Sequence, residues 1–187
     1  MPKVVIDGDV FSAVMDLMIA SGYSGTTTKQ MAEAAGISEV SLFRKYGSKA
    51  QLVRLAVTSI AERFDFETAC MYTGNIEDDL LRIVKLYQKL AAHHGQFMVM
   101  LIPELSRYPE LRDALERPVR VIGQISTLIK QYQDEGILKH ENPLHTVSSL
   151  LGPLLYSSLL KGSLLDADLE PENLEKHVAD FLYGRKI

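Results

Sequence analysis

Hydroxyl-bearing and cationic side chains gather in a short window near the N-terminus. Three consecutive threonines precede Lys29, and a second polar segment ends in Arg44 and Lys45. Threonine hydroxyls can cap a helix or donate to phosphate, and cations neutralise phosphate charge. Residues 22–55 hold five basic and two acidic residues, a net charge of +3, whereas the remainder carries −7 and the whole chain −4. This asymmetry is compatible with a DNA-binding module attached to an acidic protein.

Three short helices are expected to position these side chains. Apolar spacing, capping residues and glycine stops predict helices over 9–21, 29–35 and 39–46. In the third, Leu42 and Tyr46 lie four residues apart and are expected to face the core, which leaves a polar outer face. Small polar groups at the start of a helix and cations at its end suit the major groove of DNA. The three segments therefore predict a helix-turn-helix.

The rest of the chain is also predicted to be helical, because apolar residues recur at spacings of three and four and strand-like alternation is scarce. Pro118 predicts a kink or an early helix boundary. We expect an all-α protein of about nine helices, with a helix-turn-helix DNA-binding domain over 1–50 and a ligand-binding and dimerisation bundle over 51–187. The further predicted helices cover 49–71, 76–92, 95–105, 110–135, 143–160 and 171–183.

Composition argues against several other classes of protein. The single cysteine, Cys70, cannot form an internal disulfide, and no Cys/His spacing indicates a metal site. No Gly-rich phosphate loop or nucleophile–base set is present, so we expect no catalytic residues and no cofactor. The N-terminus lacks a signal-peptide pattern and no apolar run approaches the length of a membrane span, so we expect a cytoplasmic protein without membrane partners.

The sequence resembles the tetracycline-repressor (TetR) family in three segments: GTTTKQMAEAAGIS (25–38), SLFRKY (41–46) and SKAQL (48–52). The resemblance is close over about 9–55, and beyond that it rests on length and helical layout. It implies that the second and third helices meet DNA and that a lysine at the start of the next helix holds a phosphate. The implied DNA-binding residues are Thr27, Thr28, Lys29, Glu39, Val40, Ser41, Phe43, Arg44, Lys45 and Lys49.

Three of these positions need separate comment. Phe43 stands where the family often has tyrosine, so a hydroxyl-to-phosphate bond is missing, and Tyr46 stands where phenylalanine is common. Glu39 is unexpected beside a polyanion. It could accept a hydrogen bond from a cytosine amino group, or it could point along the DNA backbone and lower non-specific affinity. Both roles stay open.

An effector pocket could lie between the middle helices. Methionine adapts to irregular ligands, and tyrosine offers an apolar wall with a polar tip. Plain core packing is the alternative for the same side chains. The few charges in these helices favour an uncharged, partly apolar small molecule. The candidate residues are Met71, Tyr87, Phe97, Met98, Met100, Leu101 and Tyr132.

The predicted helix over 143–160 is apolar on more than one face, which indicates burial against a partner chain or, alternatively, complete burial within one chain. The family resemblance implies that this helix and the last one form a four-helix homodimer interface with their two-fold copies. The candidate interface residues are Val147, Leu150, Leu151, Leu154, Leu155, Leu159, Leu174, Val178, Phe181 and Leu182.

These expectations combine into one function. The chain is predicted to be a dimeric repressor that binds double-stranded DNA at an inverted-repeat operator and is released by a small-molecule effector. The sequence leaves open the effector, the operator and an activator role. A ligand-sensing helical bundle that no longer binds DNA is the first alternative, and a helical enzyme is the more distant one.

Overall fold

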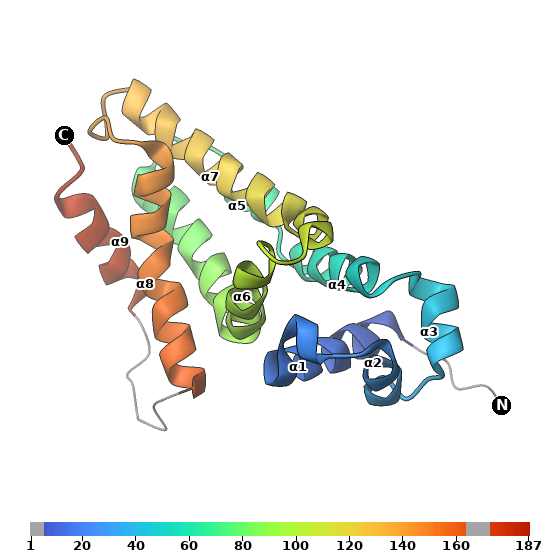
Figure 1. The fold of residues 1–187 in the computed structure, drawn as a ribbon. Helices are drawn as coiled ribbons and strands as arrows, with labels where there is room; N and C mark the ends of the chain where they lie inside the picture. Colours follow the sequence, from blue (N-terminus) through green and yellow to red (C-terminus); the bar gives the residue numbers. More distant parts are fainter. Residues whose placement is uncertain (1–5, 164–172) are drawn as a thin grey trace. The chain divides into compact units, whose positions relative to one another are not determined.

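The computed structural model describes residues 6–163 and 173–187, and over these residues it is helical with no β-strand (Figure 1). An isolated bridge pairs Leu138 with Lys186. The prediction of an all-α protein with about nine helices is confirmed. The elements are α1 (Asp7–Gly25), α2 (Thr28–Ala34), α3 (Glu39–Tyr46), α4 (Lys49–Arg63), α5 (Phe66–Ala69), α6 (Ile76–Glu104), the 3-10 helix η1 (Pro109–Leu115), α7 (Glu116–Asp134), α8 (Pro143–Ser163) and α9 (Leu174–Tyr183).

The chain packs as two compact units. Of the described residues, the first unit contains those up to Arg63 together with Gln96–Arg117, and the second contains Phe64–Gly95 and those from Pro118 onward. Helices α6 and α7 therefore contribute residues to both units. The predicted boundary at residue 50, between a DNA-binding domain and a ligand-binding domain, does not follow from these two units and stays a prediction.

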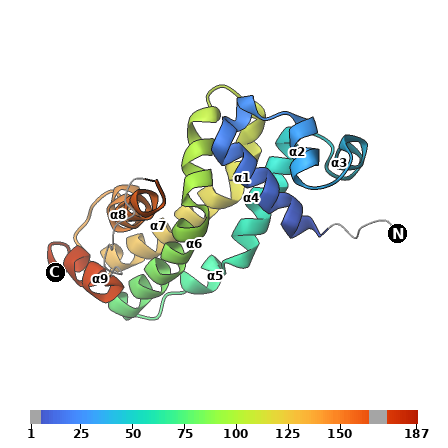
Figure 2. The ribbon, with the colours of Figure 1, turned by 90° about the horizontal axis from the view of Figure 1, so that it is seen from below.

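In the first unit, hereafter the head unit, α1 packs against α2 and α4, and α4 packs against η1 (Figure 2). The apolar stripes predicted from the sequence supply the core, because each of these helices withdraws apolar side chains from solvent. Fully buried members include Met18, Met31, Leu42 and Leu52. The head unit thus holds the three short helices on a common apolar centre.

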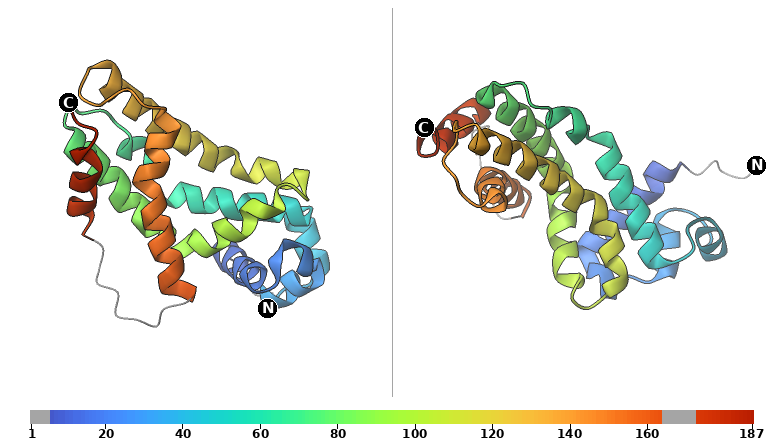
Figure 3. Two further views of the ribbon diagram at one scale, coloured as in Figure 1. Left: turned by 60° about the vertical axis from the view of Figure 1, so that its left-hand side comes forward. Right: turned by 90° about the horizontal axis from the view of Figure 1, so that it is seen from above.

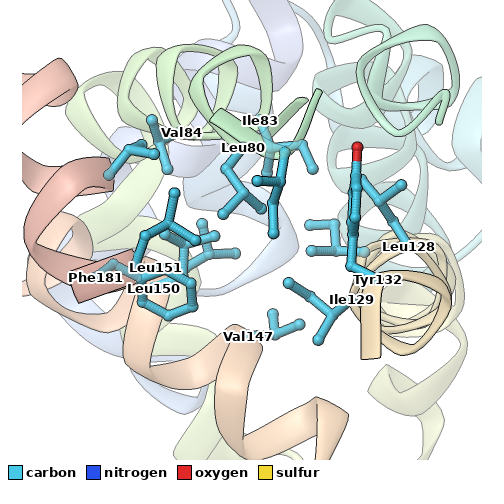
Figure 4. Close-up of a cluster of buried hydrophobic side chains, with 14 of the residues drawn as sticks. Leu80, Ile83, Val84, Leu128, Ile129, Tyr132, Val147, Leu150, Leu151 and Phe181 are labelled. Atoms are coloured by element: carbon cyan, nitrogen blue, oxygen red, sulfur yellow. The ribbon is translucent and has the colours of Figure 1, made fainter. Parts of the chain in front are cut away.

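The second unit, hereafter the bundle unit, is built around one apolar cluster. Side chains from α6, α7, α8 and α9 converge on it (Figure 4), and α8 lies beside α9 (Figure 3). Burial of this many aliphatic side chains is the main stabilising contribution in this unit. The labelled members are Leu80, Ile83, Val84, Leu128, Ile129, Tyr132, Val147, Leu150, Leu151 and Phe181.

Two predicted helix boundaries were wrong. The helix expected over 49–71 ends at Arg63, and Asp65 caps a new short helix by accepting from the Thr68 N–H at 3.0 Å. Gly95 does not begin a helix but lies inside α6. A Cβ at Gly95 would lie 3.2 Å from Leu155 Cδ1, so this glycine provides a close approach to α8.

Two further boundaries concern prolines. Pro118 lies in the first turn of α7, where a missing N–H costs no helical hydrogen bond, so the early boundary is observed and the kink is not. The final helix begins at Leu174, and the Asn173 side chain caps it by accepting from the Lys176 N–H at 2.8 Å. Pro171, the predicted start, lies outside the described residues.

Candidate nucleic-acid interface

Helix α2 begins with a capping box. Thr27 Oγ1 accepts from the Gln30 N–H at 3.2 Å, and Gln30 Oε1 accepts from the Thr27 N–H at 2.8 Å and from its hydroxyl at 2.9 Å. This reciprocal arrangement satisfies donors that a helix start otherwise leaves free. The Thr27 hydroxyl proton is therefore used within the chain, although Thr27 itself is exposed.

Helix α3, which we call the recognition helix, follows a tight turn. Gly36 has φ +66°, a conformation that glycine adopts without a Cβ penalty, and Ser38 caps α3 by accepting from the Ser41 N–H at 3.1 Å. Leu42 and Tyr46 are buried, as predicted. The opposite side of α3 is exposed. It carries Val40, Phe43, Arg44 and Lys45.

The Glu39 carboxylate has a partner within the chain. Thr28 donates a 2.6 Å hydrogen bond from its hydroxyl to Glu39 Oε1. This bond links the first residue of α2 to the first residue of α3. Charged hydrogen bonds of this length are among the stronger ones, so both side chains are held in place. Thr28 thus holds an acidic residue at the start of the recognition helix.

The other end of α3 is tied to the beginning of α1. Lys45 Nζ lies 2.6 Å from Asp7 Oδ1, and the Tyr46 hydroxyl donates to the same oxygen at 2.5 Å. The hydrogen bond from Lys45, then that from Tyr46, lowers the pKa of Asp7, and Asp7 in turn raises the pKa of Lys45. A DNA phosphate would compete with Asp7 for this lysine. Sequence reasoning did not single out Asp7, because its partners are almost forty residues away.

Lys49 is turned into the head unit. Its ammonium donates to the Tyr23 carbonyl and, at 2.5 Å, to the Thr26 carbonyl, and it lies 4.0 Å from the centre of the Tyr23 ring. Burial lowers the pKa of Lys49, and the charge of Glu104 acts in the opposite direction. The structure therefore does not place this ammonium with the exposed side chains of α2 and α3.

Two cations have no such partners. Lys29 and Arg44 are exposed, and within the described residues neither makes an ion pair or a side-chain hydrogen bond. Lys29 lies in the first turn of α2 and Arg44 in the last turn of α3. Unpaired cations on exposed helix faces are the groups best prepared to neutralise phosphate.

The predicted effector residues are divided between the two units. Phe97, Met98, Met100 and Leu101 belong to the head unit, whereas Met71, Tyr87 and Tyr132 belong to the bundle unit. Phe97 and Leu101 are fully buried in packing, Met98, Met100 and Tyr87 are half-buried, and Met71 is 61% exposed.

Tyr132 is fully buried, and its hydroxyl donates to Asp79 Oδ2 at 2.5 Å. Hydrogen bonds from Thr73 and an ion pair with Arg82 complete the surroundings of Asp79, whose side chain is fully buried. A tyrosine with a satisfied hydroxyl in this position serves the core. For Tyr132 the structure favours the packing alternative.

Most of the predicted dimer residues are also part of the core of their own chain. They offer little exposed surface in one chain, and their assignment to a dimer interface stays a prediction. Leu155, Leu159 and Leu174 are half-buried and keep some exposed surface. The seven buried residues are Val147, Leu150, Leu151, Leu154, Val178, Phe181 and Leu182.

Two negative findings apply to the described residues. Between 6 and 163 and between 173 and 187, no three His, Cys, Asp or Glu side chains gather as metal ligands would. In the same part of the chain, no helix combines the length and apolar composition needed to cross a membrane.

Comparison with known proteins finds a match for the three-helix motif. Residues 10–56 match the family model for "Bacterial regulatory proteins, tetR family". The chain is 26% identical, over 157 residues, to the HTH-type transcriptional regulator Rv1556 of Mycobacterium tuberculosis H37Rv, and the alignment covers 84% of this chain and 75% of that one.

Two solved structures share the fold at lower identity. The TetR-family regulator PfmR from Thermus thermophilus superposes with a TM-score of 0.69 at 14% identity, covering 92% of this chain and 94% of that one. The ketosteroid transcriptional regulator KstR2 of Mycobacterium tuberculosis superposes with a TM-score of 0.68 at 16% identity, covering 97% and 95%. These two likenesses concern the fold.

Proposed function

Because this chain is a helix-turn-helix transcriptional regulator of the tetR family, we propose that it is a ligand-responsive, dimeric repressor that recognises an inverted-repeat operator. The observation that carries the proposal is the recognition helix. One side of α3 is anchored by Leu42 and Tyr46, and the other presents Arg44 without an internal partner. A short helix held in this way is suited to enter the major groove.

We assign separate roles to the side chains around that helix. Lys29 and Arg44 neutralise phosphates, and Lys45 joins them once it leaves Asp7. Val40, 77% exposed, and Phe43 provide apolar contacts of the kind that recognise thymine methyl groups. Ser41 contributes a small polar side chain between them. Thr27, Thr28 and Glu39 lie beside this surface.

A homodimer would place two recognition helices on successive major grooves. The exposed sides of α8 and α9 are the surfaces for this contact, since the buried sides complete the core of one chain. They present Gly152, Tyr156 and Tyr183, the last two 65% and 94% exposed. Two-fold symmetry of the protein then requires a two-fold symmetric operator with half-sites about 34 Å apart.

Release by an effector follows from linkage. A small, partly apolar molecule that binds the DNA-free state more tightly lowers operator affinity by the same factor, about 5–150-fold in systems of this kind. The bundle unit is the proposed place of binding, with Tyr87 and Met71 as candidate contacts.

The test begins with selection of bound sequences from a pool of random duplexes, followed by anisotropy titrations of the selected duplex at several salt concentrations. Recovery of one inverted repeat is expected. Arg44→Gln and Lys29→Gln should each lower the salt slope by about 1.8, because each substitution removes one phosphate contact from both protomers of the dimer, at about 0.9 per contact. Lys130→Gln, exposed on α7, is the control and should leave the slope unchanged. Failure of the parent protein to enrich any sequence at low salt would contradict the proposal.

A further inference from the structure

Lys49 begins α4, where it was expected to bind a phosphate, yet its ammonium is occupied inside the head unit. We propose that Lys49 is a positioning residue: it joins the end of α1 to the start of α4, and so holds the recognition helix in place without contacting DNA. The proposal deepens the proposed function and rests on it.

The ammonium lies where α1 leaves the regular helix. Gly22 has φ +71° and ψ 167°, and the Thr26 hydroxyl donates back to the Gly22 carbonyl at 2.8 Å. The carbonyls of Tyr23 and Thr26 both accept hydrogen bonds from the Lys49 ammonium. Carbonyls at the end of a helix carry partial negative charge, and a lysine bonded to them is well stabilised.

The Tyr23 ring forms the base of this site. Tyr23 is only 4% exposed, and its ring packs edge-on against Tyr108 with centroids 4.8 Å apart. The ammonium of Lys49 lies 4.0 Å from the ring centre, a cation–π distance. Two carbonyl acceptors and an aromatic face together satisfy the cation, so moving it to a phosphate would break three contacts.

Glu104 opposes a phosphate at the same place. Its charge acts on Lys49, and a Cβ at Gly22 would lie 3.8 Å from Glu104 Oε1. The other carboxylate oxygen, Oε2, is buried without a hydrogen-bond partner. A phosphate brought to the Lys49 ammonium would therefore approach a carboxylate, and like charges in partly buried surroundings repel strongly.

The link matters for α3 because of chain connectivity. Only Gly47 and Ser48 separate Tyr46, the last residue of α3, from Lys49. Fixing the start of α4 against the segment that leads into α2 therefore fixes the C-terminal end of α3 as well. Lys49 would act on operator binding through α3, not through the DNA backbone.

The experiment compares Lys49→Met, which keeps the aliphatic stem and removes the charge, with Arg44→Gln. Operator affinity is measured against salt at a temperature where circular dichroism shows each variant fully folded, and a non-operator duplex is titrated in parallel. Lys49→Met should lower operator affinity at least about tenfold, as expected for loss of a charged hydrogen bond. Its salt slope and non-operator affinity should equal those of the parent, since the number of phosphate contacts is unchanged. Arg44→Gln should lower the slope.

A slope lowered by about 1.8 in Lys49→Met, one phosphate contact for each protomer, or operator affinity equal to that of the parent, would overturn the inference. If Lys49→Met does not fold, Lys49→Arg serves instead. The larger guanidinium keeps the charge but does not suit the site. A similar loss of operator affinity with an unchanged salt slope therefore supports a positioning role for Lys49. Operator affinity equal to that of the parent overturns this role. If the parent protein binds no duplex, the proposed function itself is wrong and this inference falls with it. That result differs from the two above, in which the parent protein binds the operator.

Discussion

The Thr28 hydroxyl and the Glu39 carboxylate are joined by a 2.6 Å hydrogen bond that connects the first residues of α2 and α3. The bond uses Oε1 of Glu39 and leaves Oε2 without a partner among the described residues. If α3 enters the major groove as proposed, a fixed carboxylate at its start is well placed to accept a hydrogen bond from a base edge. This geometry favours the first of the two roles that the sequence left open for Glu39.

Exchange of Glu39 for glutamine should therefore change base preference. Glutamate accepts from the cytosine amino group, whereas glutamine pairs with adenine, and such contacts discriminate by about 1–3 kcal/mol. Repeating the duplex selection with Glu39→Gln should replace cytosine by adenine at one position of each half-site. Glu33→Gln, exposed on α2, is the control. An unchanged consensus with uniformly tighter binding would show that Glu39 only lowers non-specific affinity.

Removing the charge of Asp7 should strengthen operator binding. In the Asp7→Asn variant the amide oxygen could still accept from the Tyr46 hydroxyl, but the side chain would no longer hold the Lys45 ammonium or repel phosphate. Because exposed ion pairs contribute about 0.2–1 kcal/mol, this variant should tighten binding by up to about fivefold at low salt. Anisotropy titration measures the effect, and Asp9→Asn, in the same turn of α1, is the matched control. Weaker binding by Asp7→Asn would mean that the ion pair orders α3.

Asp79 should make the bundle unit sensitive to acid. Burial alone raises the pKa of Asp79, but hydrogen bonds from Thr73 and Tyr132, with Arg82, outweigh it and leave the pKa below its ordinary 3.8. A lowered pKa stabilises the fold above the unfolded-state value, and this contribution is lost as pH falls from about 4 through the folded-state value. Asp79→Asn should lower the free energy of unfolding at pH 7 by about 3 kcal/mol.

Urea unfolding at pH 7 and pH 3 measures this difference, which should shrink at the lower pH because pH 3 lies below the unfolded-state pKa, where the unfolded chain binds a proton at this carboxylate. Asp134→Asn removes one partner of an exposed pair with Lys130 and should change stability by less than about 1 kcal/mol. A deficit in Asp79→Asn that is equal at both pH values would exclude ionisation of Asp79 as its cause.

The helix-turn-helix was predictable because its signals are local. Gly36 tolerates the turn, Ser38 caps α3, and Leu42 with Tyr46 mark the buried side. The role of Lys49 was not predictable in this way. Its acceptors are backbone carbonyls more than twenty residues earlier. Every residue carries such a carbonyl, so the residue types do not indicate which carbonyls accept a hydrogen bond.

The predicted interface on α8 shows a second limit. A helix that is apolar on several sides must be buried, but its sequence does not say whether its own chain or a partner covers each side. Here α6, α7 and α9 cover Leu150 and Leu154, so the inward side belongs to the core. Gly95 illustrates the same point, since a helix was expected to begin at this glycine, whereas α6 continues through it and packs closely against Leu155.

Two glycines in long helices should respond oppositely to substitution. Gly123 in α7 has open space where a Cβ would lie, so Gly123→Ala should stabilise the fold by about 0.5–1 kcal/mol through helix propensity. A Cβ added at Gly95 would lie 3.2 Å from Leu155 Cδ1, so Gly95→Val should destabilise the fold by about 1–3 kcal/mol through overpacking. Thermal unfolding of both variants tests this, and a stabilised Gly95→Val would show that α6 and α8 separate easily.

The exposed side of α8 offers a direct test of the dimer. A Cβ at Gly152 meets no atom within 4 Å in the single chain, so an arginine there can be accommodated without disturbing the core. The same arginine would bring two unpaired cations into a two-fold interface, where burial of unpaired charge is costly. Gly152→Arg should therefore stay folded and elute at the mass of one chain, 20.9 kDa, in light scattering after size exclusion. Its affinity for a full inverted repeat should fall toward that for a single half-site.

Gly123→Arg, equally open on α7, should remain dimeric. A dimeric Gly152→Arg would place the interface on another surface, because no side chain of that size and charge fits between closely packed copies of α8.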